Sequence, residues 1–143
     1  MKDILILGAD HNGVELKESL KTELKNSGFH CVDIGPFTSS NSVDYVDYAQ
    51  QVGKVIANKE ADCGILICGT GMGMCIAANK IDNVRAALIH DENVVSKSRE
   101  HNDSNVLCLG SWIKDNDTNI RMTKEWLNSD FGEYRHVKRI EKL

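Results

Sequence analysis

The stretch of sequence that decides the fold is ILICGTGMGMCIAANK, residues 65–80. It begins as a short apolar run typical of a β-strand, continues through three alternating glycines, and ends in a segment that permits a helix. The backbone N–H groups of such a turn and of the first helical turn lack internal partners, so they favour an anion. Cys68 ends the expected strand, where the same groups stabilise a thiolate over a thiol. This position suits a base or a nucleophile.

Tight packing is a competing interpretation for both the cysteine and the alternating glycines. Free cysteine is among the most buried residue types, so packing is the commoner role for any single one of the five cysteines. Alternating glycines after a strand can also serve only to let strand and helix pack tightly. The position of Cys68 at the junction of strand and turn nevertheless favours an anion site.

The bulk composition indicates the broad class of protein. With 143 residues, 41% hydrophobic and 27% charged, the chain suits one domain, residues 1–143. A net charge of −4 and scattered aromatics argue against nucleic acid as a partner. The sequence shows no leader pattern and no apolar run near the ~18 residues of a membrane span, so a cytoplasmic protein is expected. Five cysteines without a C-x-x-C pair predict reduced thiols and no metal site.

Apolar runs and helical patterns alternate along the chain. The runs are short and nearly continuous, as in strands buried on both faces, and they predict an α/β fold with a doubly wound, five-stranded parallel sheet in a three-layer αβα arrangement. The strands are expected at residues 4–7, 31–34, 63–68, 84–89 and 106–109. The helices are expected at residues 12–28, 43–59, 92–102 and 117–128, the first capped by Asn12 and ended by Gly28.

The chain ends in a basic, amphipathic helical tail, residues 134–143. No sixth strand is expected for this tail to pack against. We therefore interpret it as a segment that lies on a partner subunit.

Several polar residues are expected beside Cys68. Ligands of an open parallel sheet bind beyond the carboxyl ends of its strands. Asp10 and His11 directly follow the first strand, and His90 and Asp91 directly follow the fourth. Asp10 alone is equally well explained as a helix cap, but the pair close to Cys68 favours a binding site.

His101 is expected at the opposite edge of the sheet, because it closes the helix that precedes strand five. A helix of about 11 residues is ~16 Å long, so His101 should not reach Cys68 of its own chain. Two interpretations remain. His101 either caps a helix C-terminus, where a histidine is favourable, or serves the pocket of another subunit.

Several known motifs are absent from the sequence. Met74 stands six positions after Cys68, so the loop is not the Cys-x5-Arg loop of tyrosine phosphatases. No Gly-x4-Gly-Lys-Ser/Thr loop occurs. The turn reads G-x-G-x-G instead of G-x-G-x-x-G, although Asp91 lies about where a dinucleotide-binding acid is found. A non-catalytic nucleotide-binding module is therefore the alternative from another class.

Five spaced motifs, in order along the chain, resemble the ribose-5-phosphate isomerase B family. They are residues 8–11, 67–73, 77–80 and 100–103, and Arg135-His136 with Arg139. The wider family includes galactose-6-phosphate isomerase subunits and allose-6-phosphate isomerase. The resemblance implies a Rossmann-like five-stranded sheet and an aldose–ketose isomerase that needs no cofactor or metal. It also implies a homodimer or homotetramer with sites shared between subunits.

The resemblance implies a role for each matching residue. Cys68 matches the base that moves a proton between C1 and C2 through a cis-enediolate, and His101 matches the acid that opens the furanose ring, assisted by Thr70. Backbone amides of the turn would stabilise the oxyanion. Arg135 and Arg139 match a phosphate clamp. The substrate-binding positions are Asp10, His11, Tyr45, Gly69, Gly71, Gly73, Asn102, Arg135 and Arg139.

The sequence departs from the family pattern around the sugar. Trp112 follows Gly110-Ser111, where the family commonly has an arginine that holds phosphate. Val46 and Val14 replace a frequent proline and a frequent aromatic residue. The length of the sugar therefore stays open, with allose or galactose 6-phosphate as the alternative to ribose 5-phosphate.

Overall fold

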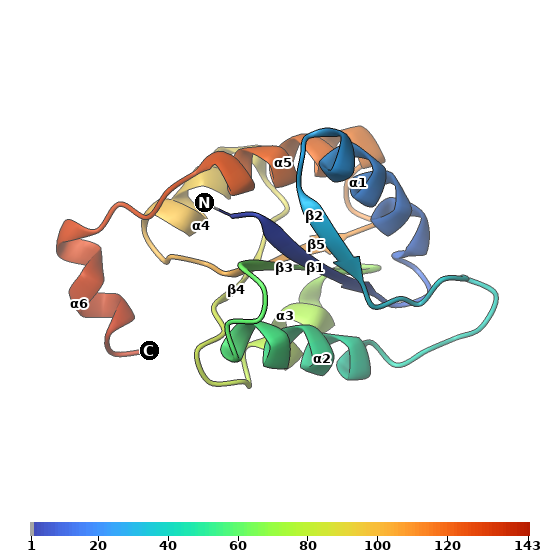
Figure 1. Cartoon of the computed structure of the whole chain (residues 1–143), viewed down its shortest axis with the longest axis horizontal. Coiled ribbons are helices and arrows are strands. Elements are labelled where there is room, and N and C mark those ends of the chain that lie inside the picture. Colours follow the sequence, from blue (N-terminus) through green and yellow to red (C-terminus); the bar gives the residue numbers. More distant parts are fainter. Residues whose placement is uncertain (1) are drawn as a thin grey trace.

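The protein is a three-layer α/β structure with a five-stranded parallel sheet (Figure 1). The computed structural model describes residues 2–143. The strand order is β2-β1-β3-β5-β4, which confirms the predicted doubly wound topology and places the Cys68 strand in the centre. The strands are β1 (Ile4–Ala9), β2 (His30–Asp33), β3 (Cys63–Cys68), β4 (Ala86–Leu88) and β5 (Val106–Gly110).

Helices cover both faces of the sheet. In Figure 1, α1 and α5 lie above the sheet with α4, and α2 and α3 lie below it. Among residues 2–143, no helix combines the length and the apolar character needed to cross a membrane. The helices are α1 (Val14–Asn26), α2 (Tyr45–Ala57), α3 (Met72–Ala78), α4 (Val95–Glu100), α5 (Asn116–Asn128) and α6 (Val137–Ile140), with 3-10 turns η1 (Glu92–Val94) and η2 (Tyr134–His136).

The central strand β3 is buried along its whole length, because its side chains alternate between two cores. Ile65 and Ile67 pack in the core under α1 and α5, together with Trp126. Leu66 and Cys68 belong to the core on the α2 and α3 side. Cys68 is thereby directed toward the layer that contains the glycine turn and the start of α3.

The start of α1 differs from the expectation. Asn12 was expected to be the N-cap, but Gly13 occupies that position and makes no side-chain cap. The Asn12 N–H instead donates to Asp10 Oδ1 at 2.8 Å, which closes a tight turn after β1. A Cβ on Gly13 would lie 2.6 Å from the Ile67 carbonyl oxygen. The N-cap position therefore requires a glycine, because the backbones of α1 and β3 approach each other closely there.

A buried ion pair joins α1 to β2. Lys17 Nζ lies 2.7 Å from each carboxylate oxygen of Asp33, and the Lys17 side chain is fully buried. Asp33 Oδ1 also accepts the Gly35 N–H at 2.9 Å. The pair thus fixes the start of the loop that runs across the ends of the strands to α2.

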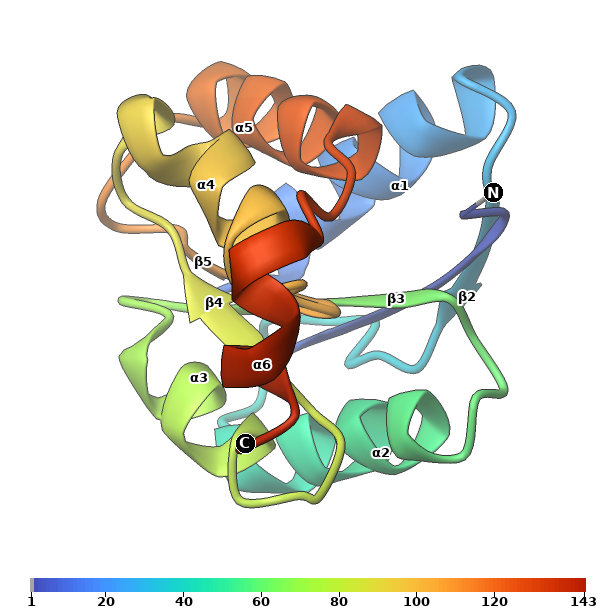
Figure 2. The same ribbon diagram turned by 90° about the vertical axis from the view of Figure 1, so that its left-hand side faces the viewer.

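The C-terminal tail leaves the rest of the fold. Figure 1 shows α6 on the side opposite to the carboxyl ends of the strands, and Figure 2 shows it in front of the edge strand β4. None of the residues of η2 and α6 is buried, and Tyr134 is 90% exposed. The predicted helical tail is confirmed.

Candidate active site

Cys68 ends β3 at the edge where the parallel strands finish. Its side chain is only 6% exposed, and its Sγ accepts the Gly71 N–H at 3.1 Å. Gly71 is the N-cap of α3 with φ at +77°, and a Cβ there would lie 2.7 Å from Leu88 Cδ1. Glycine at this position therefore allows an amide to approach the sulfur, a contact suited to a thiolate.

The turn after Cys68 is held from two sides. His90 Nε2 lies 2.7 Å from the Thr70 carbonyl oxygen, and Thr70 Oγ1 accepts the Met72 N–H at 3.3 Å. Across the turn, the Ser111 N–H donates to the Cys68 carbonyl at 2.9 Å. His90 is expected at this edge because it directly follows the fourth strand, but it is not among the predicted site residues. Its position after the strand is the feature of the sequence that indicates a role in the site.

The loop after β1 lies beside Cys68. The Asp10 N–H donates to the Ile67 carbonyl at 3.0 Å, and the Asp10 side chain is buried. His11 Nδ1 accepts the Val43 N–H at 3.2 Å, which anchors the loop before α2. The structure therefore brings Asp10 and His11 to the edge that carries Cys68, as the sequence predicted.

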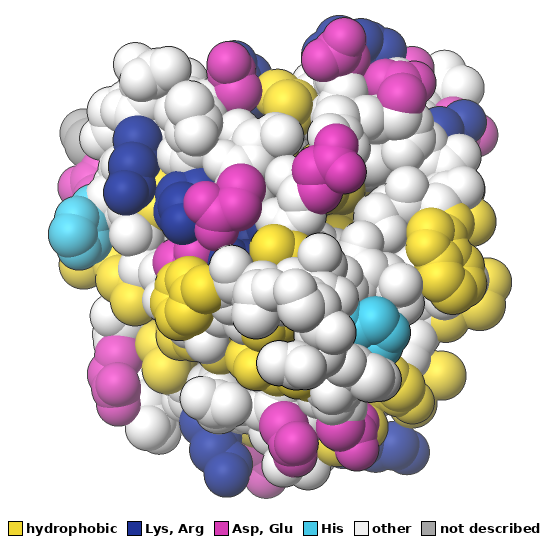
Figure 3. Space-filling model, turned by 90° about the vertical axis from the view of Figure 1, so that its right-hand side faces the viewer, with side chains coloured by type: hydrophobic (Ala, Val, Ile, Leu, Met, Phe, Trp, Pro, Cys, Tyr) yellow, Lys and Arg dark blue, Asp and Glu magenta, His cyan; other side chains and the backbone are white. Residues whose placement is uncertain are grey.

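Figure 3 shows this face of the molecule. White and hydrophobic atoms make up most of its middle, with a histidine to the right of the centre and acidic and basic side chains in the upper part.

A second group of predicted residues gathers elsewhere. His101, Asn102, Arg135 and Arg139 line one pocket of about 500 Å³. The His101 ring stacks on the ring of His136, with centroids 4.5 Å apart and planes 16° from parallel. Sequence reasoning included His136 in a motif but did not predict this stacking.

This pocket lies at the edge opposite to Cys68. His101 follows α4 and precedes the start of β5, and Asp103 lines a cavity with Cys63, the first residue of β3. Cys68 is the last residue of that six-residue strand, which spans roughly 20 Å. The predicted separation of His101 from Cys68 within one chain is confirmed.

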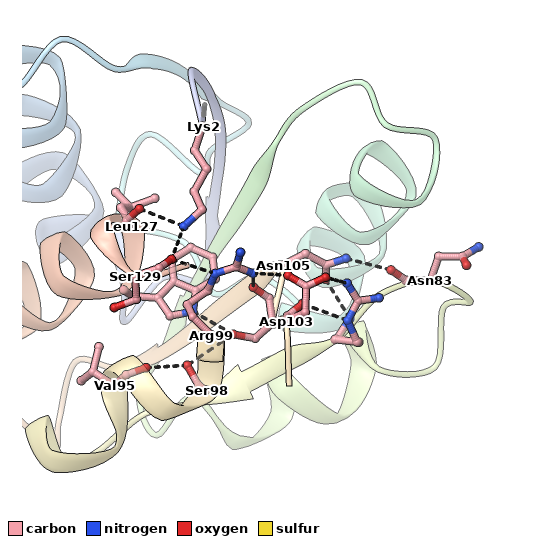
Figure 4. A network of polar contacts seen from close by, with 12 residues as sticks. Lys2, Asn83, Val95, Ser98, Arg99, Asp103, Asn105, Leu127 and Ser129 are labelled. Carbon is pink, nitrogen blue, oxygen red and sulfur yellow. Dashed lines mark hydrogen bonds and ion pairs between the residues drawn. The ribbon is translucent and has the colours of Figure 1, made fainter. Parts of the chain in front are cut away.

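An ionic network fixes the segment that carries His101 and Asn102 (Figure 4). Asp103 Oδ2 lies 2.9 Å from Arg85 Nη2, and Asp103 Oδ1 lies 3.0 Å from Arg99 Nη1. Arg85 Nε also donates to the Asp103 carbonyl at 2.9 Å. Asp103 has φ at +45°, so these contacts hold a left-handed turn directly after the two site residues.

Replacing Asp103 with asparagine tests this network. Asparagine tolerates the positive φ but removes the negative charge between two guanidinium groups, of which Arg99 is 8% exposed. We expect the free energy of unfolding in urea to fall by about 1–3 kcal/mol, less than for a fully buried pair because the Asp103 side chain is 30% exposed.

The matched control for that substitution is Glu92→Gln, which breaks the exposed Arg121–Glu92 pair. Its free energy of unfolding should change by less than about 1 kcal/mol. Equal stability of the two variants would show that the Asp103 network contributes nothing.

The other thiols differ in their environments. A hydrogen bond with the Cys108 thiol, together with contacts from the Leu88 backbone and the Asn79 side chain, lowers the pKa of Cys75 to about 7. Burial raises the pKa of Cys63 to about 11. Burial also raises the pKa of Cys31. Cys75 is therefore the most readily ionised of these three thiols.

Alkylation should reveal this order. Because the thiolate is the nucleophile, the rate at which iodoacetamide modifies Cys75 should rise through about pH 7 and level off above it. Cys63 should stay unmodified over the same range because its pKa is about 11 and it is buried. Peptide mass spectrometry after short pulses measures both rates, with Cys75→Ser as the control. A Cys75 profile with the midpoint of an ordinary exposed thiol would contradict the assignment.

No cluster of three or more His, Cys, Asp or Glu side chains in residues 2–143 is arranged to hold a metal ion. The candidate site residues supply a thiol, a carboxylate, backbone and side-chain amides, a hydroxyl, imidazoles and guanidinium groups.

A doubly wound sheet that carries a thiol and a glycine turn at the carboxyl end of its central strand defines an α/β protein with a candidate ligand site at that edge. Comparison with known proteins identifies the kind of protein. The model of the family described as Ribose/Galactose Isomerase matches residues 5–143. The chain belongs to this family and is an isomerase.

Individual relatives agree with this membership. The chain is 41% identical to a probable ribose-5-phosphate isomerase B of Mycoplasma genitalium, covering 97% of this chain and 92% of the relative. It is 38% identical to ribose-5-phosphate isomerase B of Escherichia coli, covering 97% of this chain and 93% of the relative.

Solved structures share the fold. Ribose-5-phosphate isomerase B of Clostridium thermocellum matches with a TM-score of 0.95 and 38% identity, covering 97% of this chain and 93% of that one. The Mycoplasma genitalium isomerase B with bound ribulose-5-phosphate matches with a TM-score of 0.94 and 40% identity, covering 99% of this chain and 94% of that one. The resemblance in sequence and the fold it implied are both confirmed.

Proposed function

We propose that the protein interconverts ribose 5-phosphate and ribulose 5-phosphate, with Cys68 as the base. The observation that carries this proposal is the thiol at the end of β3, whose Sγ accepts the Gly71 N–H at 3.1 Å beside the buried Asp10. A solved relative binding ribulose-5-phosphate supports the choice of substrate.

In the proposed reaction, protonated His101 donates a proton to the ring oxygen, and the proton of the C1 hydroxyl passes to a solvent water, assisted by the Thr70 hydroxyl. The C1–O bond to the ring breaks and an open-chain aldehyde forms. The Cys68 thiolate then removes the proton from C2, and the electron pair moves onto the C1 carbonyl oxygen to give a cis-enediolate. The thiol returns the proton to C1, and the proton of the C2 hydroxyl passes to O1, which leaves a ketone at C2. No cofactor or metal enters these steps.

The amides of the turn have separate tasks in this scheme. The Gly71 N–H already binds the sulfur, so it stabilises the thiolate before proton transfer. Gly73 is the second residue of α3, and its N–H therefore lacks an intrahelical acceptor. The amides of Gly69, Thr70 and Gly73 stabilise the enediolate oxygen, where preorganised donors have the largest effect.

The complete site is shared between two subunits in this proposal. Cys68 and His101 lie at opposite edges of one chain, so the pocket of His101, Asn102, Arg135 and Arg139 must come from a partner. The two arginines bind the phosphate, and Asn102 meets the sugar opposite Asp10, His11 and Tyr45. A homodimer or a homotetramer built of such dimers satisfies this geometry.

Substrate competition tests the proposed function. The value of kcat/KM for ribose 5-phosphate should exceed those for allose 6-phosphate and galactose 6-phosphate by at least about tenfold. The reverse order would show a six-carbon isomerase.

Asp91 argues against a nucleotide-binding module, because its carboxylate caps η1 by accepting the Asn93 N–H at 2.9 Å. Saturable heat on titration with ATP or NAD, without turnover of any sugar phosphate, would support that module instead.

A further inference from the structure

Two aromatic rings pack directly on glycines of the turn. A Cβ on Gly69 would lie 2.7 Å from three ring atoms of Trp112, and a Cβ on Gly73 would lie 2.6 Å from two ring atoms of Tyr45. Real Cβ atoms essentially never make contacts this short. Each ring therefore occupies the space that a side chain on the glycine would need. Trp112 is absent from the substrate-binding positions that the family resemblance implied.

The backbone of Trp112 is fixed relative to Cys68. The Trp112 N–H donates to the Gly69 carbonyl at 2.9 Å, and the neighbouring Ser111 N–H donates to the Cys68 carbonyl at 2.9 Å. Ser111 Oγ also donates to the Asn12 carbonyl at 2.9 Å. The indole nevertheless remains 69% exposed, so one of its faces covers Gly69 and the rest is open to a ligand.

The two rings come from opposite layers of the fold. Tyr45 begins α2, which covers one face of the sheet, whereas Trp112 precedes α5, which covers the other (Figure 1). Cys68 and its turn lie between these layers at the carboxyl ends of the strands. The rings therefore bound the Cys68 site on two sides, with Tyr45 39% exposed.

From this geometry we propose that Trp112 is a specificity-determining residue that limits the length of the sugar, an inference that rests on the proposed function. An indole has no charge for a phosphate, and it offers bulk and an apolar face to the carbon chain. Because its backbone is tied to Gly69 and its ring is packed on that glycine, it cannot withdraw without breaking contacts. The Trp112 indole therefore forms a wall of the pocket that admits a five-carbon sugar phosphate and excludes a six-carbon one.

Two variants at this position test the proposal in the full-length protein. We compare kcat/KM for ribose 5-phosphate and allose 6-phosphate in the unmodified protein, in Trp112→Ala and in Trp112→Phe. In Trp112→Ala, the ratio of the two values should move at least about tenfold toward the six-carbon sugar, as expected when bulk is removed from a pocket wall. Trp112→Phe keeps an aromatic wall and should move the ratio by less than about threefold.

The outcomes separate this inference from the proposed function. If the unmodified protein turns over ribose 5-phosphate and the ratio is unchanged in Trp112→Ala, the inference is wrong and the proposed function stands. If the unmodified protein turns over neither sugar phosphate, the proposed function fails and the inference falls with it.

Fluorescence gives a second readout that does not depend on turnover. The only other tryptophan, Trp126, is fully buried, so the difference between Cys68→Ser and Cys68→Ser/Trp112→Phe isolates the emission of Trp112. Ribose 5-phosphate should shift that emission to shorter wavelength and saturate. Calorimetric binding of ribose 5-phosphate without any change in Trp112 emission would overturn the proposal.

Discussion

Replacing Cys68 with alanine is expected to lower kcat/KM for ribose 5-phosphate by about a thousandfold or more, because it removes the proposed base. The loss should fall on kcat and leave KM nearly unchanged, since the sulfur moves a proton and the guanidinium groups bind the phosphate. A coupled assay of ribulose 5-phosphate formation measures both constants. Exchange of substrate hydrogen with deuterium from solvent should be lost to the same extent.

The matched control is Cys31→Ala, which removes a half-buried thiol from the edge strand β2. Its activity should equal that of the unmodified protein. Circular dichroism must show that Cys68→Ala is folded, since the substitution leaves the Gly71 N–H without its sulfur acceptor. A folded Cys68→Ala protein with near-normal turnover would refute the proposed mechanism.

Two inactive variants, Cys68→Ala and His101→Ala, should regain about one quarter of the unmodified activity when their subunits are mixed in equal amounts. Half of the dimers formed at random are mixed, and each mixed dimer has one intact site of two. The physical reason is the placement of Cys68 and His101 at opposite edges of one chain, so that each site takes one residue from each subunit.

Co-expression with two different affinity tags, followed by purification on both, isolates the mixed dimers for this test. The control pairs Cys68→Ala with Asp10→Ala, which lie at the same edge of the chain. In that mixed dimer each site carries one substitution, so no activity should return. Absence of rescue in purified Cys68→Ala/His101→Ala dimers would show that the site is not shared in the way proposed.

Most of the fold was predictable because it follows from local patterns. The run from Cys63 to Cys68 is buried at every position, as an unbroken apolar strand in a parallel sheet must be. Gly28, with φ at +92°, follows α1 where the sequence placed the end of that helix. Asn12 was the exception, since the cap at Gly13 depends on how closely α1 approaches the carbonyl of Ile67.

The residues of the candidate site were predictable by their position on the strands, but their partners were not. Asp10 and Cys68 each end or follow a strand, which the apolar runs reveal. The contact of His90 with the Thr70 carbonyl joins residues 20 positions apart. The packing of Trp112 on Gly69 likewise joins two different turns, and no sequence pattern in either turn predicts this contact.

The sequence by itself determined the strands, the glycine turn after Cys68 and the placement of Cys68 and His101 at opposite edges. These features follow from side-chain periodicity and from the few backbone angles that each residue allows, both of which act within a few residues. Only the tertiary structure decided that Arg85 and Arg99 would meet at Asp103, and that Trp112 and Tyr45 would fill the spaces over two glycines. Such contacts depend on how whole layers pack, because atoms far apart in the chain become neighbours only after the sheet and its helices have assembled.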